Sequence, residues 1–152
     1  MKIWRICRAK FAAEAFSGHG ARRFGGRWNS PGVPMVYSSS SLALAAMELF
    51  VHLEPNQQPG DLVSIAAELP ESEPVRRLQP EKLHRGWWKG DFEPLRAIGD
   101  KWIREKSSLA IEVPSATLRT EWNVLVNPLH PRVVEIKVEA PLPFRFDARM
   151  FR

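Results

Sequence analysis

Short stretches of apolar and polar residues follow one another along the chain and predict many small elements. Alternating or compact apolar stretches, typical of strands, are found at residues 2–8, 34–38, 62–69, 108–113, 123–126 and 132–139. Residues 143–151 are expected to form a final edge strand or an extended tail. Thirteen prolines and nine glycines separate these stretches, which argues against a helical bundle.

Helical spacing marks two longer stretches, residues 40–53 and 92–106. Serines at 38–41 supply an N-cap for the first helix, which we expect to begin near Leu42. Gly99 weakens the second helix only modestly. Short helical turns are expected near 11–16 and 81–89, and connectors at 18–34, 54–60 and 70–80. Helices in the first two thirds with strands at both ends predict an α+β fold rather than a βαβ parallel sheet.

The length of 152 residues favours one domain, spanning 1–152. With 44% hydrophobic and 26% charged residues, the composition is that of a soluble globular protein. The single cysteine, Cys7, excludes an intrachain disulfide and fits a reducing compartment. The sequence contains no apolar run of membrane-spanning length, and its first ten residues lack the apolar core of a signal peptide. We therefore expect a cytoplasmic protein.

A net charge of +5 has two interpretations. A basic protein attracts polyanions, including nucleic acid and nucleotide phosphates, but many small domains are basic without a specific reason, and composition alone favours this second interpretation. Residues 18–34 are relevant to anion binding, because Arg22, Arg23 and Arg27 lie there among glycines. Arginine forks match phosphate geometry and glycines let backbone N–H groups approach an anion, although ordinary surface turns look similar.

One acid, Glu48, is found in the otherwise apolar helix at 40–53. Such a carboxylate is costly unless it is paired, protonated or used in chemistry. His52 lies four residues later and shares its helix face. The alternative is that this pair marks the solvent edge of a partly buried helix.

Several other kinds of site are not expected. The four histidines are scattered and there is no cysteine pair or HExxH motif, so we expect no metal site. Walker, Rossmann and GxSxG fingerprints are absent. The pair Trp87-Trp88 could stack on a base or fill a core, and core packing is the more frequent role.

What remains is an arginine, a tyrosine, a carboxylate and a serine on separate elements. This set suits cleavage of an N-glycosidic bond next to a pyrophosphate. Arg27 would grip phosphate or ribose, and the ring of Tyr37 would face a cationic base. Glu48 would stabilise an oxocarbenium-like transition state.

Three motifs together carry a family resemblance: GxGARRFGGRWNSPGxPxVYSSSSLALAAxE, SSLAIEVPSA and NVLVNPLHP. The chain resembles the RES-domain family over nearly its whole length. These are toxins of toxin–antitoxin pairs whose partner is an Xre-type helix-turn-helix antitoxin. The resemblance implies a fold similar to ADP-ribosyltransferases, with a split, mostly antiparallel sheet holding NAD in a cleft. It also implies NAD consumption by phosphorolysis or hydrolysis, and some members transfer ADP-ribose to a protein.

The resemblance also implies the roles of individual residues. Its arginine, glutamate and serine fall on Arg27, Glu48 and Ser115, with Ser107 and Ser108 as nearby alternatives to the serine, and its active-site tyrosine falls on Tyr37. Contacts to the dinucleotide are expected from Gly26, Trp28, Asn29, His52 and Asn127. The NPLHP motif, which contains Asn127 and His130, could instead be a structural turn.

The expected partners follow from these assignments. NAD is the substrate, no metal is required, and the acceptor stays open between inorganic phosphate, water and a protein side chain. Membrane binding and direct nucleic-acid binding are not expected. A rival of another class is a basic nucleic-acid-binding module using RRF, GGRW and the tryptophan pair, but it leaves Tyr37 and Glu48 without a role.

Overall fold

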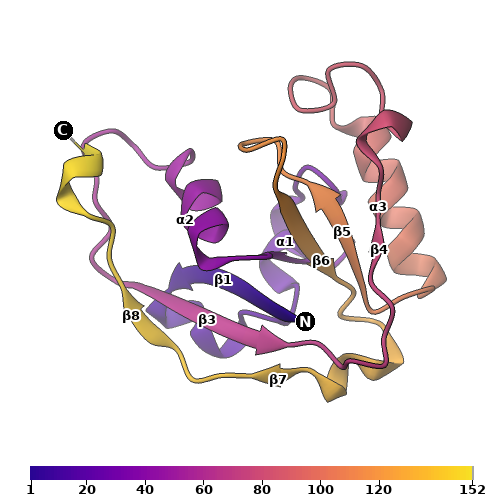
Figure 1. Ribbon diagram of the computed structural model, residues 1–152, viewed down its shortest axis with the longest axis horizontal. Helices are drawn as coiled ribbons and strands as arrows, with labels where there is room; N and C mark the ends of the chain where they lie inside the picture. Colours follow the sequence, from indigo (N-terminus) through magenta and orange to yellow (C-terminus); the bar gives the residue numbers. More distant parts are fainter. Residues whose placement is uncertain (152) are drawn as a thin grey trace.

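An eight-stranded sheet forms the centre of the protein, which a computed structural model describes for residues 1–151 (Figure 1). The strands are β1 (Lys2–Arg8), β2 (Val36–Ser39), β3 (Leu62–Glu68), β4 (Arg76–Arg77), β5 (Ala110–Pro114), β6 (Trp122–Val126), β7 (Lys137–Val138) and β8 (Leu142–Phe144). Their order is β4-β5-β6-β2-β1-β3-β7, and β8 also pairs with β3. Only β4 and β5 pair in parallel within this described part of the chain. The predicted α+β fold with a mostly antiparallel sheet is confirmed.

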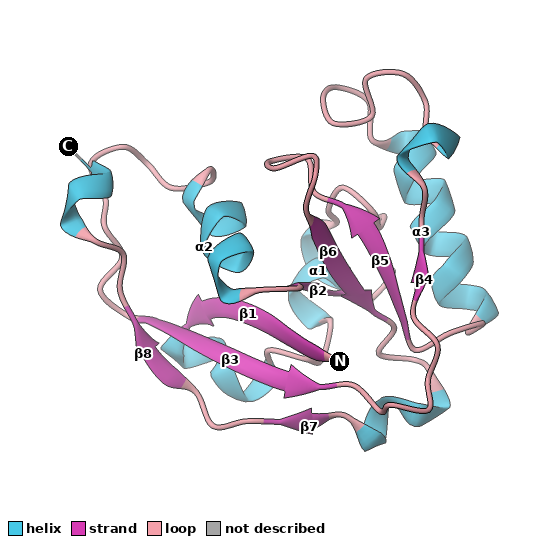
Figure 2. Ribbon diagram, viewed as in Figure 1, coloured by secondary structure: helices cyan, strands magenta, loops and turns pink. Residues whose placement is uncertain are grey.

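The sheet is split between β1 and β2 (Figure 2). These two strands share one residue pair, Trp4 with Ser39, whereas β1 pairs with β3 along its whole length and β2 pairs with β6 along its whole length. Arg5 bridges the gap, because its Nη1 donates a hydrogen bond of 2.8 Å to the backbone carbonyl of Tyr37. The sheet therefore consists of two halves joined at a narrow seam.

Three α-helices and four 3₁₀ helices surround the sheet over residues 1–151. They are α1 (His19–Phe24), α2 (Leu42–Phe50) and α3 (Glu93–Glu105), with η1 (Ala9–Glu14), η2 (Pro80–Lys82), η3 (Pro131–Glu135) and η4 (Ala148–Phe151). As expected, a serine caps α2: the Ser41 hydroxyl accepts a hydrogen bond of 3.1 Å from the amide of Leu44. No helix in this range is both long and apolar enough to cross a membrane.

Two hydrophobic clusters fill the two faces of the sheet. One contains Ile3, Val36, Ala67, Leu69, Leu109, Ala110, Val124 and Val126. The other contains Trp28, Met35, Trp87, Leu95, Trp102, Ile103, Val113 and Leu125. Alternation along β6, with Leu125 between Val124 and Val126, puts the clusters on opposite faces. The buried side of α3 covers the second cluster.

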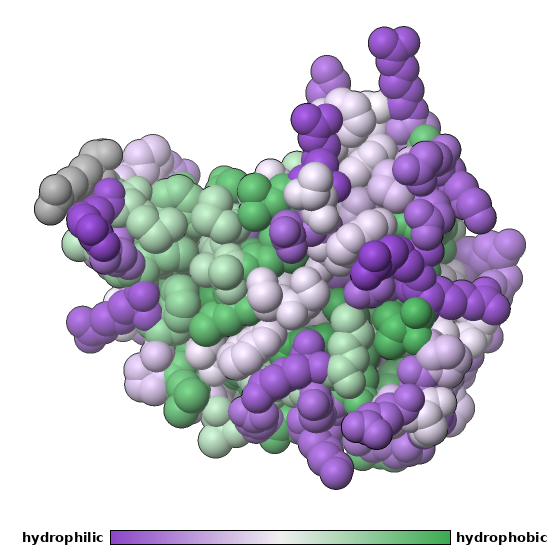
Figure 3. Space-filling view, in the orientation of Figure 1, coloured by the Kyte–Doolittle hydropathy of each residue, from purple (hydrophilic) through white to green (hydrophobic). Residues whose placement is uncertain are grey.

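Aromatic rings hold the C-terminal segment against α2. Phe50 of α2 lies 5.7 Å from Phe146 and 5.5 Å from Phe151, measured between ring centroids. Phe144 of β8 extends this contact, since its ring is 5.1 Å from that of Phe146. Hydrophobic residues gather over this side of the molecule in the space-filling view (Figure 3). The helix that carries Glu48 is thus packed between the sheet and the end of the chain.

Expectations about local structure are wrong at residues 18–34 and 132–139, and Ala148–Phe151 forms η4 where an edge strand or extended tail was expected. Residues 18–34 were expected to have no regular structure, but α1 forms there between Gly18 and Gly25, whose positive φ angles of 76° and 71° let the chain turn at both ends. Residues 132–139 were expected to form a strand. The chain instead forms η3, which begins at Pro131 after His130 caps it, and of these residues Lys137–Val138 alone form a strand, β7.

Gly99 brings α3 into direct contact with residues 26–30. A Cβ atom at Gly99 would lie 1.8 Å from the carbonyl oxygen of Trp28, so only glycine fits. On the same side of α3, Arg96 Nε donates to the Gly26 carbonyl at 2.8 Å, and Asp100 Oδ1 accepts from the amide of Ser30 at 2.9 Å. The segment that contains Arg27 is therefore fixed to α3 at three points.

We expect the substitution Gly99→Ala to destabilise the protein by about 2 kcal/mol, because the added methyl group must displace the backbone of Trp28. Alanine normally stabilises a helix interior relative to glycine, so a loss of stability on Gly99→Ala would reveal the steric contact with Trp28. The measurement is the free energy of unfolding in urea. As a control, Ala97→Gly on the exposed side of α3 should cost about 1 kcal/mol through helix propensity alone. Increased stability of Gly99→Ala would contradict the contact.

Candidate active site

The carboxylate of Glu48, in the last turn of α2, accepts three hydrogen bonds from side chains. Ser115 Oγ and Asn123 Nδ2 donate to Oε1 at 2.5 and 2.6 Å, and Thr117 Oγ1 donates to Oε2 at 3.0 Å. A carboxylate has about four acceptor positions, so one on Oε2 stays open to a ligand. Glu48 is half-buried, and this set of donors offsets the cost of removing its charge from water.

The surroundings of Ser115 determine which way its hydroxyl points. Ser115 is fully buried just after β5, and its Oγ accepts hydrogen bonds from the amides of Thr117 at 3.1 Å and Leu118 at 2.9 Å. Its single proton is therefore available to Glu48. Of the alternative serines, Ser108 bonds to Trp102 and to the carbonyl of Ala110. The structure thus places Ser115 at the carboxylate.

Asn123 is oriented across the sheet by Ser39. These residues are paired in register between β6 and β2, and Ser39 Oγ donates to Asn123 Oδ1 at 2.7 Å. The amide oxygen is therefore occupied, and the NH₂ group faces Glu48. Side chains alternate along a strand, so Tyr37 lies on the same face of β2 as Ser39. The register of β2 brings the predicted tyrosine to the side of the sheet where Glu48 lies.

Tyr37 has both functions of its hydroxyl group satisfied. Its oxygen accepts from the amide of Trp28 at 2.9 Å, and its proton is donated to Asn29 Oδ1 at 2.6 Å. Burial raises the pKa of Tyr37 well above its ordinary value, against the smaller lowering effect of the Trp28 amide. The phenol is therefore neutral at ordinary pH, and its proton is already donated to Asn29.

Arg27 contacts Trp87 and Phe92, and its guanidinium is near enough to Glu48 to feel the charge of that carboxylate. Burial lowers the pKa of Arg27, and the charge of Glu48 acts in the opposite direction. One Nη1 proton is donated to the Trp87 carbonyl at 3.3 Å, and the guanidinium carbon lies 4.4 Å from the centre of the Phe92 ring. The guanidinium retains further N–H donors for an anion.

The other residues of the GGRWN segment position the loop. A Cβ at Gly26 would lie 2.6 Å from the Tyr37 hydroxyl oxygen, so glycine is needed for the close approach. Asn29 is fully buried and donates to the carbonyls of Ala21 and Val33, both at 2.8 Å. Trp28 is buried in the second cluster. The structure buries the side chains of Trp28 and Asn29, and the Trp28 amide and the Asn29 side-chain oxygen bond to the Tyr37 hydroxyl. The contacts of Trp28 and Asn29 with a dinucleotide stay predictions.

Two further predicted contacts, His52 and Asn127, make no hydrogen bond to Glu48 within residues 1–151. His52 is exposed on the turn after α2, because the helix ends at Phe50 and the expected i, i+4 face is not completed. Asn127 is fully buried at the opposite end of β6 from Asn123. Its amide donates to the Ile103 carbonyl at 3.1 Å and its oxygen accepts from the Leu129 amide at 2.9 Å. Both polar ends of Asn127 are used inside the protein.

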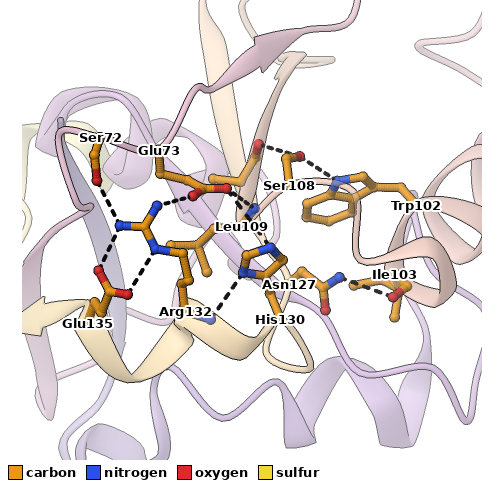
Figure 4. A network of polar contacts seen from close by, with 11 residues as sticks. Ser72, Glu73, Trp102, Ile103, Ser108, Leu109, Asn127, His130, Arg132 and Glu135 are labelled. Atoms are coloured by element: carbon orange, nitrogen blue, oxygen red, sulfur yellow. Dashed lines mark hydrogen bonds and ion pairs between the residues drawn. The ribbon is translucent and has the colours of Figure 1, made fainter.

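The NPLHP turn belongs to a separate polar network (Figure 4). Glu73 accepts from Arg132 and from the amide of Leu109, and its carboxylate lies 3.9 Å from His130 Nε2. Arg132 also bonds to Glu135 at 2.8 and 2.9 Å. This network attaches the connector before β4 to the turn after β6, so the turn has a structural role. No group of three metal-ligating side chains occurs within residues 1–151.

Sequence comparison gives the family to which this site belongs. The family model described as the RES domain matches residues 2–147. The chain belongs to the RES domain family. Its relatives include proteins called Toxin Res from Yersinia enterocolitica, 33% identical over 99% of both chains, and from Pseudomonas putida, 35% identical over 99% of this chain and all of the other. A Sphingobium protein called Prs ADP-ribosylating toxin is 34% identical over 99% of this chain and 96% of its own.

A solved structure shows the same fold as this RES domain. The crystal structure of the M. tuberculosis MbcT–MbcA toxin–antitoxin complex contains a chain with a TM-score of 0.75 and 19% sequence identity. The match covers 95% of this chain and 84% of that one. At this level of identity the likeness establishes the fold alone.

Thr117 and Asn123 were not identified from the sequence, although they supply two of the three donors to Glu48. The only available signal for Thr117 was its position two residues after Ser115. Asn123 becomes recognisable only when β6 is placed beside β2, which puts it opposite Ser39. Both belong to the candidate site of this RES domain.

The buried phenol predicts a pH dependence of stability in this RES domain. Because burial raises the pKa of Tyr37, the unfolded chain loses the phenol proton at a lower pH than the folded chain. The contribution of the protonated phenol to the free energy of unfolding is fully present below the ordinary tyrosine pKa of about 10. It is lost as the pH rises toward the pKa of Tyr37 in the folded protein. Tyr37 is the single tyrosine, so tyrosinate absorbance during alkaline unfolding reports on this residue alone.

A Tyr37→Phe variant serves as the control, since it removes the titrating group and keeps the ring. Its free energy of unfolding should depend less steeply on pH above about 10 than that of the parent chain. Ionisation of Tyr37 at an ordinary pH in the folded protein would contradict the burial and hydrogen bonding described above.

Proposed function

We propose that this RES domain is a toxin that cleaves NAD⁺ between nicotinamide and ribose. The observation that carries the proposal is the Glu48 carboxylate, held by three donors and accompanied by Arg27 and Tyr37. Relatives called Toxin Res align over 99% of the chain, which supports the toxin role. The relative called Prs ADP-ribosylating toxin supports chemistry at the ADP-ribose unit.

Glu48 has the properties that this bond cleavage requires. When the bond breaks, its electron pair leaves with the nicotinamide nitrogen, which becomes neutral, and positive charge develops on the ribose. A carboxylate fixed by donors stabilises this charge without having to reorganise. The open acceptor position on Oε2 suits a ribose hydroxyl, which would orient the sugar over Glu48.

Arg27 and Tyr37 fit the two sides of the same substrate. Arg27 keeps N–H donors beyond the one used on Trp87, and these match phosphate or ribose oxygens. The neutral ring of Tyr37 presents a π face to the positively charged nicotinamide. Because both hydrogen-bonding functions of its hydroxyl are occupied, Tyr37 acts by packing rather than by proton transfer.

A second candidate function is transfer of ADP-ribose to a protein, favoured by the name of the Sphingobium relative. It shares the cleavage step and differs only in the acceptor. A nucleic-acid-binding role gains no support from the tryptophan pair, because Trp87 is 5% exposed and belongs to the core. We further propose a helix-turn-helix antitoxin of the Xre type as partner, consistent with the toxin–antitoxin complex formed by the structural neighbour.

The substitution Glu48→Gln tests the central role of the carboxylate. It preserves size but removes the charge, so we expect nicotinamide release from NAD⁺ to fall by at least about 100-fold. The measurement is nicotinamide release with purified protein, with circular dichroism to check folding. Glu54→Gln, on an exposed residue after α2, is the matched control and should retain full activity. Full turnover by Glu48→Gln would contradict the proposal.

Product analysis separates the acceptors. Labelled NAD⁺ incubated with wild-type protein should give ADP-ribose if water attacks, and ADP-ribose phosphate in the presence of inorganic phosphate if phosphate attacks. Label that stays with a protein band on a denaturing gel would favour ADP-ribose transfer. Absence of nicotinamide release under all three conditions would reject NAD⁺ cleavage altogether.

A further inference from the structure

Two arginines border the same two-residue aromatic segment, Trp87-Trp88. Arg27 donates to the Trp87 carbonyl at 3.3 Å. Arg119 lies over the indole of Trp88, with its guanidinium carbon 4.7 Å from the ring centroid. The two cations come from distant parts of the chain, and both contact this two-residue segment.

Packing fixes the positions of both tryptophans in this segment. Trp87 is anchored in the second hydrophobic cluster, and the ring of Trp88 meets it edge-on, with centroids 6.1 Å apart and planes at 90°. Trp88 itself is half-buried. A guanidinium stacked on such a ring is held in place through its face.

Arg119 is also close in sequence to one of the donors to Glu48. It lies in the turn between β5 and β6, two residues after Thr117, which donates to the Glu48 carboxylate. This turn and the loop that precedes α3 lie at the same end of the molecule (Figure 1). On the other side, Arg27 is close enough for the charge of Glu48 to affect its pKa.

Both guanidiniums have donors to spare. Within residues 1–151, neither Arg27 nor Arg119 forms an ion pair with a carboxylate at 4.0 Å or less, as the ion pairs of the described chain involve other residues. Stacking occupies the face of the guanidinium, whereas its five N–H groups lie in the plane and point outward. Arg119 is exposed, so these donors are available to an incoming ligand.

We propose that Arg119 forms, together with Arg27, a subsite for phosphate oxygens beside Glu48. This inference deepens the proposed cleavage of NAD⁺ and rests on it. Two sources of phosphate share this chemistry: the diphosphate of the dinucleotide and free inorganic phosphate. In the second case a phosphate oxygen forms the new bond to the ribose carbon, while the old bond breaks and nicotinamide leaves with its electron pair.

The test compares Arg119→Ala with Arg104→Ala. Arg104 is exposed on α3 and its substitution removes the same charge, so it controls for net charge. ADP-ribose is the first probe, because it carries the diphosphate and has no nicotinamide to lose. We expect Arg119→Ala to weaken ADP-ribose binding, or to raise the KM for phosphate, by about tenfold or more. Arg104→Ala should change neither quantity appreciably.

The two sources give different results in steady-state kinetics. A higher KM for NAD⁺ together with weaker ADP-ribose binding would assign Arg119 to the diphosphate. A higher KM for inorganic phosphate, with ADP-ribose binding unchanged, would assign it to the attacking phosphate. Either result supports the subsite.

Variants of the supporting ring test the geometry separately from the charge. Trp88→Ala removes the ring on which Arg119 stacks and leaves Arg119 in the chain, so it should weaken binding of the same ligand as Arg119→Ala does. Trp88→Phe keeps an aromatic face and should restore most of the binding. Arg119→Lys keeps the charge without the planar fork and should restore only part of it.

Some results would overturn the inference. If Arg119→Ala binds ADP-ribose and uses phosphate as wild-type protein does, the subsite is rejected. The proposed cleavage of NAD⁺ does not depend on this result. If wild-type protein binds ADP-ribose but releases no nicotinamide, the proposed function fails, and the binding data still decide the role of Arg119. If wild-type protein binds neither ADP-ribose nor inorganic phosphate and releases no nicotinamide, both the subsite and the proposed function are rejected.

Discussion

Three donors converge on the carboxylate of Glu48, and the rest of the site depends on this convergence. They come from the end of β5, the turn that follows it and the start of β6, whereas the acid itself is carried by α2. A half-buried charge without such partners would be costly. The position of α2 and the register of the sheet are therefore required together, because a shift of one residue in β6 would turn Asn123 to the opposite face.

Backbone contacts with α3 position the other half of the site. Arg96, Gly99 and Asp100 are spaced to face one side of the helix, and each meets a different backbone group of residues 26–30. The same segment supplies Arg27 and holds the phenol of Tyr37. Close packing at Gly99 and the hydrogen bonds of Arg96 and Asp100 thus determine together where the guanidinium lies.

Local patterns predicted those parts of the fold that local interactions determine. The bounds of β1, the Ser41 cap of α2 and most of α3 follow from periodicity and capping. The α1 helix was missed because glycines at both ends look like loop residues. Thr117 and Asn123 were missed because their importance depends on which strands become neighbours, which periodicity does not encode. Periodicity also did not show that tertiary packing buries Trp28 and Asn29, whose contacts with a ligand stay predictions. The chemical roles of Arg27, Tyr37, Glu48 and Ser115 stay predictions.

The narrow seam between β1 and β2 has a mechanical consequence. Glu48 is carried by α2, which packs mainly on β1, while its donors belong to the other half of the sheet. The hydrogen bonds of Glu48 therefore link the two halves of the sheet, which backbone pairing between β1 and β2 joins at a single residue pair. A ligand hydroxyl at the open acceptor position on Oε2 would leave all three of these hydrogen bonds in place, so the site can be occupied without separating the two halves of the sheet.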